Sequence, residues 1–135
     1  MARGRNHINQ SHVFEDGGAT CLARVLGNDG AAITQASVST ITCAVYDLDS
    51  AAPSVAIISP TVTVGSAVFD TLQGANNADG RWSVDLIGYN FLFALPATSF
   101  PTGGHKYTAE FKVTPASGAV FWLKYEFEAI KVLTS

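Results

Sequence analysis

The segment Asp47-Leu48-Asp49-Ser50 is the one acidic cluster of the sequence whose residue types could do chemistry. Alternating carboxylate and hydroxyl oxygens can join a site for a hard cation, provided that a carboxylate from another loop faces them. Nothing that resembles the twelve-residue calcium loop, with its glycine and terminal glutamate, follows this segment. We therefore expect a solvated loop in which the aspartates accept hydrogen bonds from turns, and no metal site.

Catalytic motifs are absent from the sequence. It contains no GxSxG, HExxH, CxxC, phosphate-binding or dinucleotide-binding pattern, and His7, His12 and His105 are not spaced as metal ligands on one element. An enzyme needs a nucleophile or a positioned acid and base. We expect no enzymatic activity and no cofactor.

The two cysteines, Cys21 and Cys43, are too far apart in sequence for a typical metal site and can form at most one disulfide. In a reducing cytosol we expect two buried thiols that pack as small apolar residues. The alternative is a disulfide between adjacent strands.

Composition bounds the class of protein. The 135 residues are 47% hydrophobic and only 14% charged, against about 25% in ordinary soluble domains. This excludes disorder, fits a single domain, and suggests that other subunits cover part of the surface. Eight Lys and Arg against eleven Asp and Glu, a net charge of -3, argue against nucleic-acid binding.

The first fourteen residues lack the apolar core of a signal peptide, so we expect folding in the cytosol. No run of 18 apolar residues occurs, so we expect no membrane span.

The elements that would position these residues are β-strands. Turn-forming residues recur at short intervals between runs of β-branched and aromatic residues, which is typical of an all-β sandwich. A short helix is expected over 66–73 and a loop over 74–80, and Pro60 indicates that its strand lies at a sheet edge. About seven strands are expected, over 20–26, 38–48, 55–64, 81–86, 89–95, 106–113 and 120–132.

The alternation of apolar residues along these strands predicts the core. It is clearest in 106–113 and 120–132, which a turn at 115–118 joins into a hairpin. The spacing of the strands suggests an Ig-like Greek-key sandwich, with Tyr107 in the position of the tyrosine that such folds often carry at the start of a late strand. The expected core residues are Phe91, Phe93, Tyr107, Phe111, Leu123 and Tyr125.

Residues 1–19 are expected to form an extended N-terminal arm, followed by a sandwich domain over 20–135. Up to Gly17-Gly18 the segment is polar and lacks alternation, and Arg3 and Arg5 make its start basic. The arm would contact a neighbouring subunit, and the alternative is a frayed terminus. The interface candidates are Arg3, Arg5, Ile8, Val13, Phe14, Trp82 and Trp122.

The two tryptophans carry alternative interpretations. Trp122 lies in the outward phase of its strand, which favours an interface role, whereas a second sheet over it would make it a core residue. Exposed Trp82 and Trp122 could instead stack on sugar rings, so a carbohydrate-binding or adhesion module is the alternative function of another class.

Several segments resemble small Ig-like proteins that are encoded among the structural genes of tailed bacteriophages and prophages. The resemblance covers most of residues 13–130 and is carried by turn and packing motifs. It implies a non-enzymatic virion protein, above all a capsid-surface cement or decoration protein, or else a neck, tail or baseplate adaptor. Its partners would be the major capsid protein or neck and tail proteins, in a homo-oligomer on the virion, with assembly in the host cytoplasm. The segments are VFEDGGAT (13–20), VYDLDS (45–50), VFDTLQ (68–73), GYNF (88–91) and LPATSFPTGGHKYTAEFKVTPASG (95–118).

Overall fold

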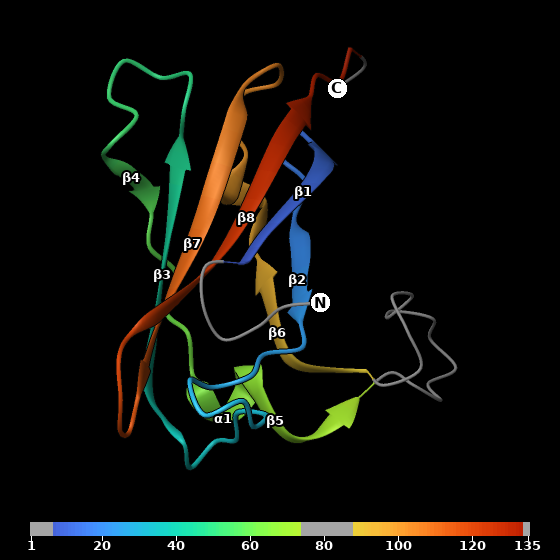
Figure 1. Cartoon of the computed structure of the whole chain (residues 1–135). Helices are drawn as coiled ribbons and strands as arrows, with labels where there is room; N and C mark the ends of the chain where they lie inside the picture. The colour runs from blue at the N-terminus through green and yellow to red at the C-terminus, as the bar shows by residue number, and fades with distance from the viewer. Residues whose placement is uncertain (1–6, 74–87, 134–135) are drawn as a thin grey trace.

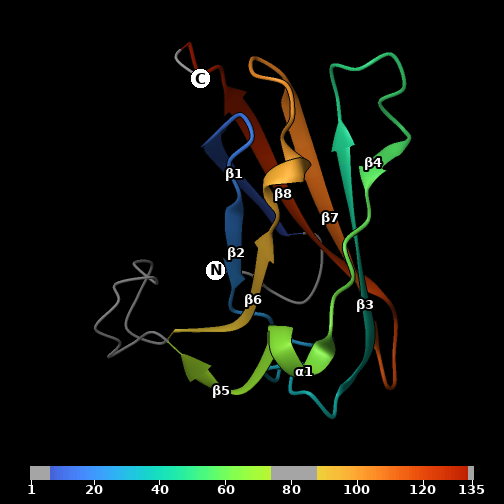
Figure 2. The ribbon, with the colours of Figure 1, turned by 180° about the vertical axis from the view of Figure 1, so that it is seen from behind.

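Two β-sheets pack face to face in the computed structural model, which describes residues 7–73 and 88–133 (Figure 1). The larger sheet has the strand order β1-β8-β7-β3-β4 and the smaller one, in front in Figure 2, has the order β2-β6-β5. The expected all-β sandwich is confirmed. No helix among the described residues is long and apolar enough to cross a membrane. The elements are β1 (His7–Phe14), β2 (Ala19–Ala23), β3 (Val38–Asp47), β4 (Ala56–Ile58), α1 (Val64–Ala67), β5 (Val68–Gln73), β6 (Tyr89–Leu95), the 3-10 turn η1 (Ala97–Ser99), β7 (Lys106–Pro115) and β8 (Phe121–Ile130).

The strand order is that of an immunoglobulin-type sandwich. If β2 to β8 are taken as strands B, C, C′, D, E, F and G, the smaller sheet reads B-E-D and the larger one reads G-F-C-C′. Every strand pair is antiparallel except β1 with β8. The chain crosses between the two sheets at β1 to β2, β2 to β3, β4 to β5 and β6 to β7, and such crossings are typical of a Greek-key sandwich.

The core lies between the sheets and centres on Phe111. Its ring packs edge-on against Phe91 and Phe93 of the smaller sheet, with centroids 5.1 and 5.6 Å away, and against Tyr125 at 5.7 Å. The expected core is confirmed, since five of its six residues are buried and Phe93 is half-buried against the others. The strict alternation of β7 and β8 produces this packing because successive side chains point to opposite faces.

Tyr107 fastens the loop that precedes its own strand. The hydroxyl accepts a hydrogen bond from the Thr102 N–H at 2.8 Å and lies 3.2 Å from the Thr102 carbonyl, to which it donates. The ring is fully buried and packs edge-on against Phe100, with centroids 5.4 Å apart. This is the arrangement of a tyrosine corner, and it confirms the position expected for Tyr107.

Strand β1 is a correction to the expected arm. Residues 7–14 pair in parallel with β8 along their whole length, from His7 opposite Leu123 to Phe14 opposite Ile130. They are therefore an edge strand of the larger sheet rather than an arm outside the sandwich, whereas residues 1–6 lie outside the described part of the chain. The pattern was misleading because Val13 is the one described side chain of β1 that packs against the core. A strand that places so few of its described side chains in the core shows no clear alternation.

The expected helix over 66–73 is also corrected. The helix α1 covers only Val64–Ala67, and the next six residues form β5. Val68 is fully buried opposite Phe91, and Phe69 packs edge-on against Tyr89 at 5.9 Å, so pairing with β6 outweighs the helical spacing.

Other boundaries differ less. The strand expected over 55–64 is reduced to β4, which lies at the edge of the larger sheet as Pro60 predicted. The turn between β7 and β8 includes Gly118 at φ +103°, a conformation that favours glycine. The loop expected over 74–80 and the strand expected over 81–86 lie outside the described residues.

Candidate functional site

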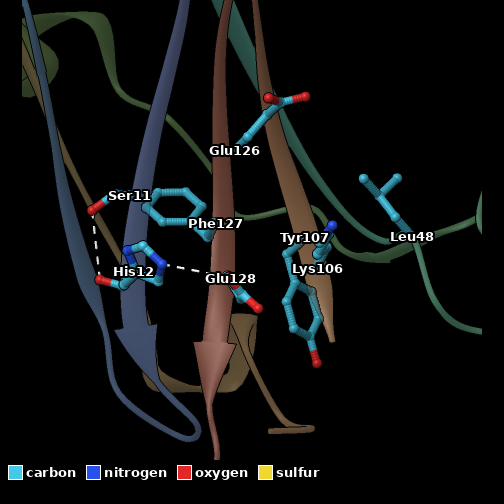
Figure 3. Close-up of a pocket in the computed structure, with 8 residues that line it drawn as sticks. All are labelled: Ser11, His12, Leu48, Lys106, Tyr107, Glu126, Phe127 and Glu128. Carbon is cyan, nitrogen blue, oxygen red and sulfur yellow. Dashed lines mark hydrogen bonds and ion pairs between the residues drawn. The ribbon is translucent and has the colours of Figure 1, made fainter. Parts of the chain in front are cut away.

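A shallow pocket of about 600 Å³ crosses the outer face of the larger sheet (Figure 3). It is one feature of the described surface that could receive a ligand or a partner. Its centre is a row of three side chains from neighbouring strands, because register places His12 of β1 and Lys106 of β7 on either side of Glu128 of β8. The pocket is lined by Ser11, His12, Leu48, Lys106, Tyr107, Glu126, Phe127 and Glu128.

The residue types in this pocket resemble a catalytic triad, but their geometry does not. The His12 Nε2 atom lies 3.4 Å from a carboxylate oxygen of Glu128, as the dashed line in Figure 3 shows. The Ser11 hydroxyl, however, is 3.5 Å from the carbonyl oxygen of His12 rather than from its imidazole. A serine is activated as a nucleophile only when its hydroxyl bonds to the base. The pocket therefore offers polar contacts and no activated hydroxyl.

The contact between His12 and Glu128 is open to water. Their side chains are 68% and 52% exposed, and pairs of this kind stabilise a fold by at most about 1 kcal/mol. These side chains are therefore available to a partner at small cost to the fold.

The second cluster is Asp47 with His105, at the end of the sandwich. Both carboxylate oxygens of the buried Asp47 lie within 2.9 Å of His105 Nδ1, although the two residues are 58 positions apart. The Asp49 N–H donates to Asp47 at 3.0 Å, and the Lys106 N–H donates to Asp49 at 2.8 Å. The aspartates thus accept the expected hydrogen bonds and join the end of β3 to the start of β7, but Asp47 is a buried residue of β3 and not part of a solvated loop.

This cluster contains half of a catalytic arrangement. Asp47 orients the imidazole of His105 as a carboxylate orients a histidine that acts as a general base. Within the described part of the chain, however, no hydroxyl or thiol that could act as a nucleophile hydrogen bonds to His105. The described residues also include no group of three or more His, Cys, Asp or Glu side chains that could hold a metal ion. The sequence did not predict this pair, although the inward phase of Asp47 on β3 indicated a buried carboxylate that needs a partner.

Glu15 connects three segments at the same end. Its two carboxylate oxygens accept hydrogen bonds from the Val132 N–H at 2.7 Å and the Gly103 N–H at 2.9 Å. These backbone donors, with Val132 the stronger cause, lower the pKa of the Glu15 carboxyl below its ordinary value. The turn that leads from β1 to β2 is thereby held against the loop before β7 and the end of β8.

The candidate interface residues are spread over the molecule. Phe14 is 63% exposed beside Ile130, and Trp122 is 42% exposed at the opposite end of β8. Trp122 therefore faces outward and is not covered by the second sheet, and the ammonium of Lys112 lies 5.9 Å from the centre of its ring. Val13 packs against the core.

Ile8 belongs to β1, and Arg3, Arg5 and Trp82 lie outside the described residues. The structure thus brings Phe14 and Ile130 together and leaves Trp122 apart from them.

Comparison of the chain with models of known protein families, with curated proteins and with solved structures found no match. The assignment of the fold therefore depends on the strand topology, the sheet packing and the tyrosine corner described above. The resemblance to phage structural proteins stays a prediction from the sequence.

Proposed function

We propose that this chain is a non-enzymatic structural protein of a tailed-phage virion, and specifically a cement protein on the capsid surface. The resemblance of its segments supports the virion, and the low charge supports contact with other subunits. The observation that carries the assembly role is the pair Phe14 and Ile130. These two apolar side chains lie side by side on the outer face of the sandwich and are 63% and 41% exposed.

Exposed apolar side chains beside a polar surface are typical of protein contacts. Phe14 and Ile130 adjoin the row of His12 and Glu128, which supplies polar partners next to them. A third exposed apolar residue, Trp122, lies at the opposite end of β8 from Ile130. The outer side of β8 therefore has apolar ends and a charged middle, which suits docking against a larger surface.

The experiment is a mass-spectrometric inventory of purified particles from the host that carries the gene, followed by a particle reconstruction. A cement protein is expected at a copy number comparable with that of the major capsid protein, on the outside of the head. A few copies at the neck or tail would favour the adaptor alternative. Complete absence from particles would reject the virion role.

A matched pair of variants tests whether the exposed surface at Phe14 contacts the particle. Phe14→Ser removes the exposed ring and is expected to reduce occupancy on particles by about tenfold or more, as loss of an interface aromatic does. Leu72→Ser is the control, since Leu72 is 38% exposed on β5 of the smaller sheet. Equal occupancy of both variants would place the contact elsewhere.

A carbohydrate-binding module is the second candidate, favoured by the exposure of Trp122. Stacking on a sugar ring needs one open face of the indole, and the ammonium of Lys112 lies 5.9 Å from the ring centre. Screening of the protein against glycans should then show binding that Trp122→Ala abolishes and Leu72→Ser retains. Binding that Trp122→Ala leaves unchanged would remove this candidate.

A further inference from the structure

The outer edge of β1 is the longest regular strand edge that the described residues leave without a partner strand. β1 has eight residues in unbroken register, whereas β4 has three, β2 has five, and the pairing of β5 contains a register shift. Free monomers protect such edges with short strands, bulges, prolines or charged side chains. The sequence HINQSHVF of β1 contains no proline, lysine, arginine, aspartate or glutamate.

The backbone groups on that edge can be assigned from one hydrogen bond. The Glu15 N–H donates to the Ile130 carbonyl at 2.9 Å. In a parallel ladder alternate residues face the neighbouring strand, so residues 11 and 13 also face β8, and residues 8, 10 and 12 turn their N–H and C=O groups away from it. The Phe14 carbonyl already accepts from the Gly17 N–H at 2.9 Å. The open groups are therefore centred on residue 10.

We propose that β1 pairs antiparallel with β1 of a second copy of this chain, around a two-fold axis at residue 10. Residue 10 then exchanges two backbone hydrogen bonds with its own copy, and residues 8 and 12 exchange theirs with each other, so that the N–H and C=O groups of all three residues gain partners. The two larger sheets become one continuous sheet. This interface is isologous, as in most homodimers.

The charges on either side of β1 in the sequence favour a second copy of the chain in the antiparallel orientation. In the sequence, Arg3 and Arg5 precede β1, while Glu15 and Asp16 follow it. Antiparallel pairing brings the start of one β1, which follows the basic segment of the sequence, beside the end of the other β1, which precedes the acidic pair. Parallel pairing would bring like charges together, which is unfavourable.

The first test measures the oligomeric state of the full chain by sedimentation equilibrium up to about 100 µM, a concentration that reveals weak dimers. A reversible dimer is expected. His12→Pro removes an N–H that faces away from β8, so it leaves the ladder within the chain intact and should raise the dimer dissociation constant at least about tenfold. The matched variant His12→Thr should dimerise like the wild type. A strictly monomeric wild type, or a His12→Pro variant that dimerises equally well, overturns the proposal.

A cross-linking experiment fixes the register and stays informative if His12→Pro fails to fold. With the axis at residue 10, the two Cα atoms in a Gln10→Cys dimer are about 5.5 Å apart, within the range of a disulfide. The copies of residue 12 are four positions out of register, about 13 Å apart, which is too far. Mild oxidation should therefore cross-link Gln10→Cys and not His12→Cys. The opposite result, or a dimer in which neither variant is cross-linked, would contradict the interface.

The dimer goes beyond the proposed virion role and does not rest on it. A dimer with these properties from a protein that is absent from particles would reject the virion role alone. A monomeric protein found on capsids would reject the dimer alone.

Discussion

Phe111 is the residue on which the two sheets converge, because its ring contacts aromatic side chains of both. Phe111→Ala would remove a fully buried ring and leave a cavity, which should lower the free energy of unfolding by about 3 to 5 kcal/mol. Urea denaturation measures this change. A loss below about 1 kcal/mol would mean that the side chain is not in the core.

The two buried thiols should be inaccessible to alkylating reagents in the folded protein. Cys21 and Cys43 are free and buried, and burial raises the pKa of Cys43 to about 12 and raises that of Cys21 further. We expect alkylation without reductant to label neither cysteine in the native protein and both in urea, as mass spectrometry can show. A chain that stays unlabelled in urea and is lighter by two hydrogens would contain a disulfide instead.

At the scale of elements, the alternation of β7 and β8 made them predictable, while β1 was not. In the hairpin of β7 and β8 one face is buried and the other is exposed, so the sequence alternates between apolar and polar residues. An edge strand is held mainly by backbone hydrogen bonds, which any sequence can make. The pair Asp47 and His105 was missed for a related reason. Asp47 ends β3 and His105 directly precedes β7, and only the pairing of these two strands brings them together.

The fastening of the turn from β1 to β2 depends on pH. Because the folded pKa of Glu15 is lowered from its ordinary 4.5, the carboxylate contributes stability that is present above that value and is lost as the pH falls through the folded pKa. Glu15→Gln should therefore lower the urea midpoint at pH 7 and have a smaller effect at pH 3. The matched variant Asp16→Asn should show no such difference, since the neighbouring Asp16 is exposed. Equal losses from Glu15→Gln at both pH values would contradict this role.

For the whole molecule, the larger sheet needs β1 to cover one edge of β8. Deletion of residues 2–14 would expose the β8 edge and remove the contact of Val13 with the core. The truncated protein should melt at a lower temperature than the full chain and aggregate more readily, as differential scanning calorimetry and light scattering can measure. An unchanged melting temperature would show that β1 is dispensable for the fold.

The pairing of β1 with β8 joins the first and last strands of the described chain, from His7 to Ile130. On the ribosome, β1 is made before the other strands of this sandwich and β8 after them, so the residues of β1 must wait in an unpaired state while the rest of the sandwich forms. Closing so long a loop is slow, because its entropy is lost before the contacts are gained. Nascent-chain folding should therefore end with the docking of β1, after the core around Phe111 is complete. A ribosome-bound chain truncated before β8 would leave β1 as accessible to protease as an unfolded segment.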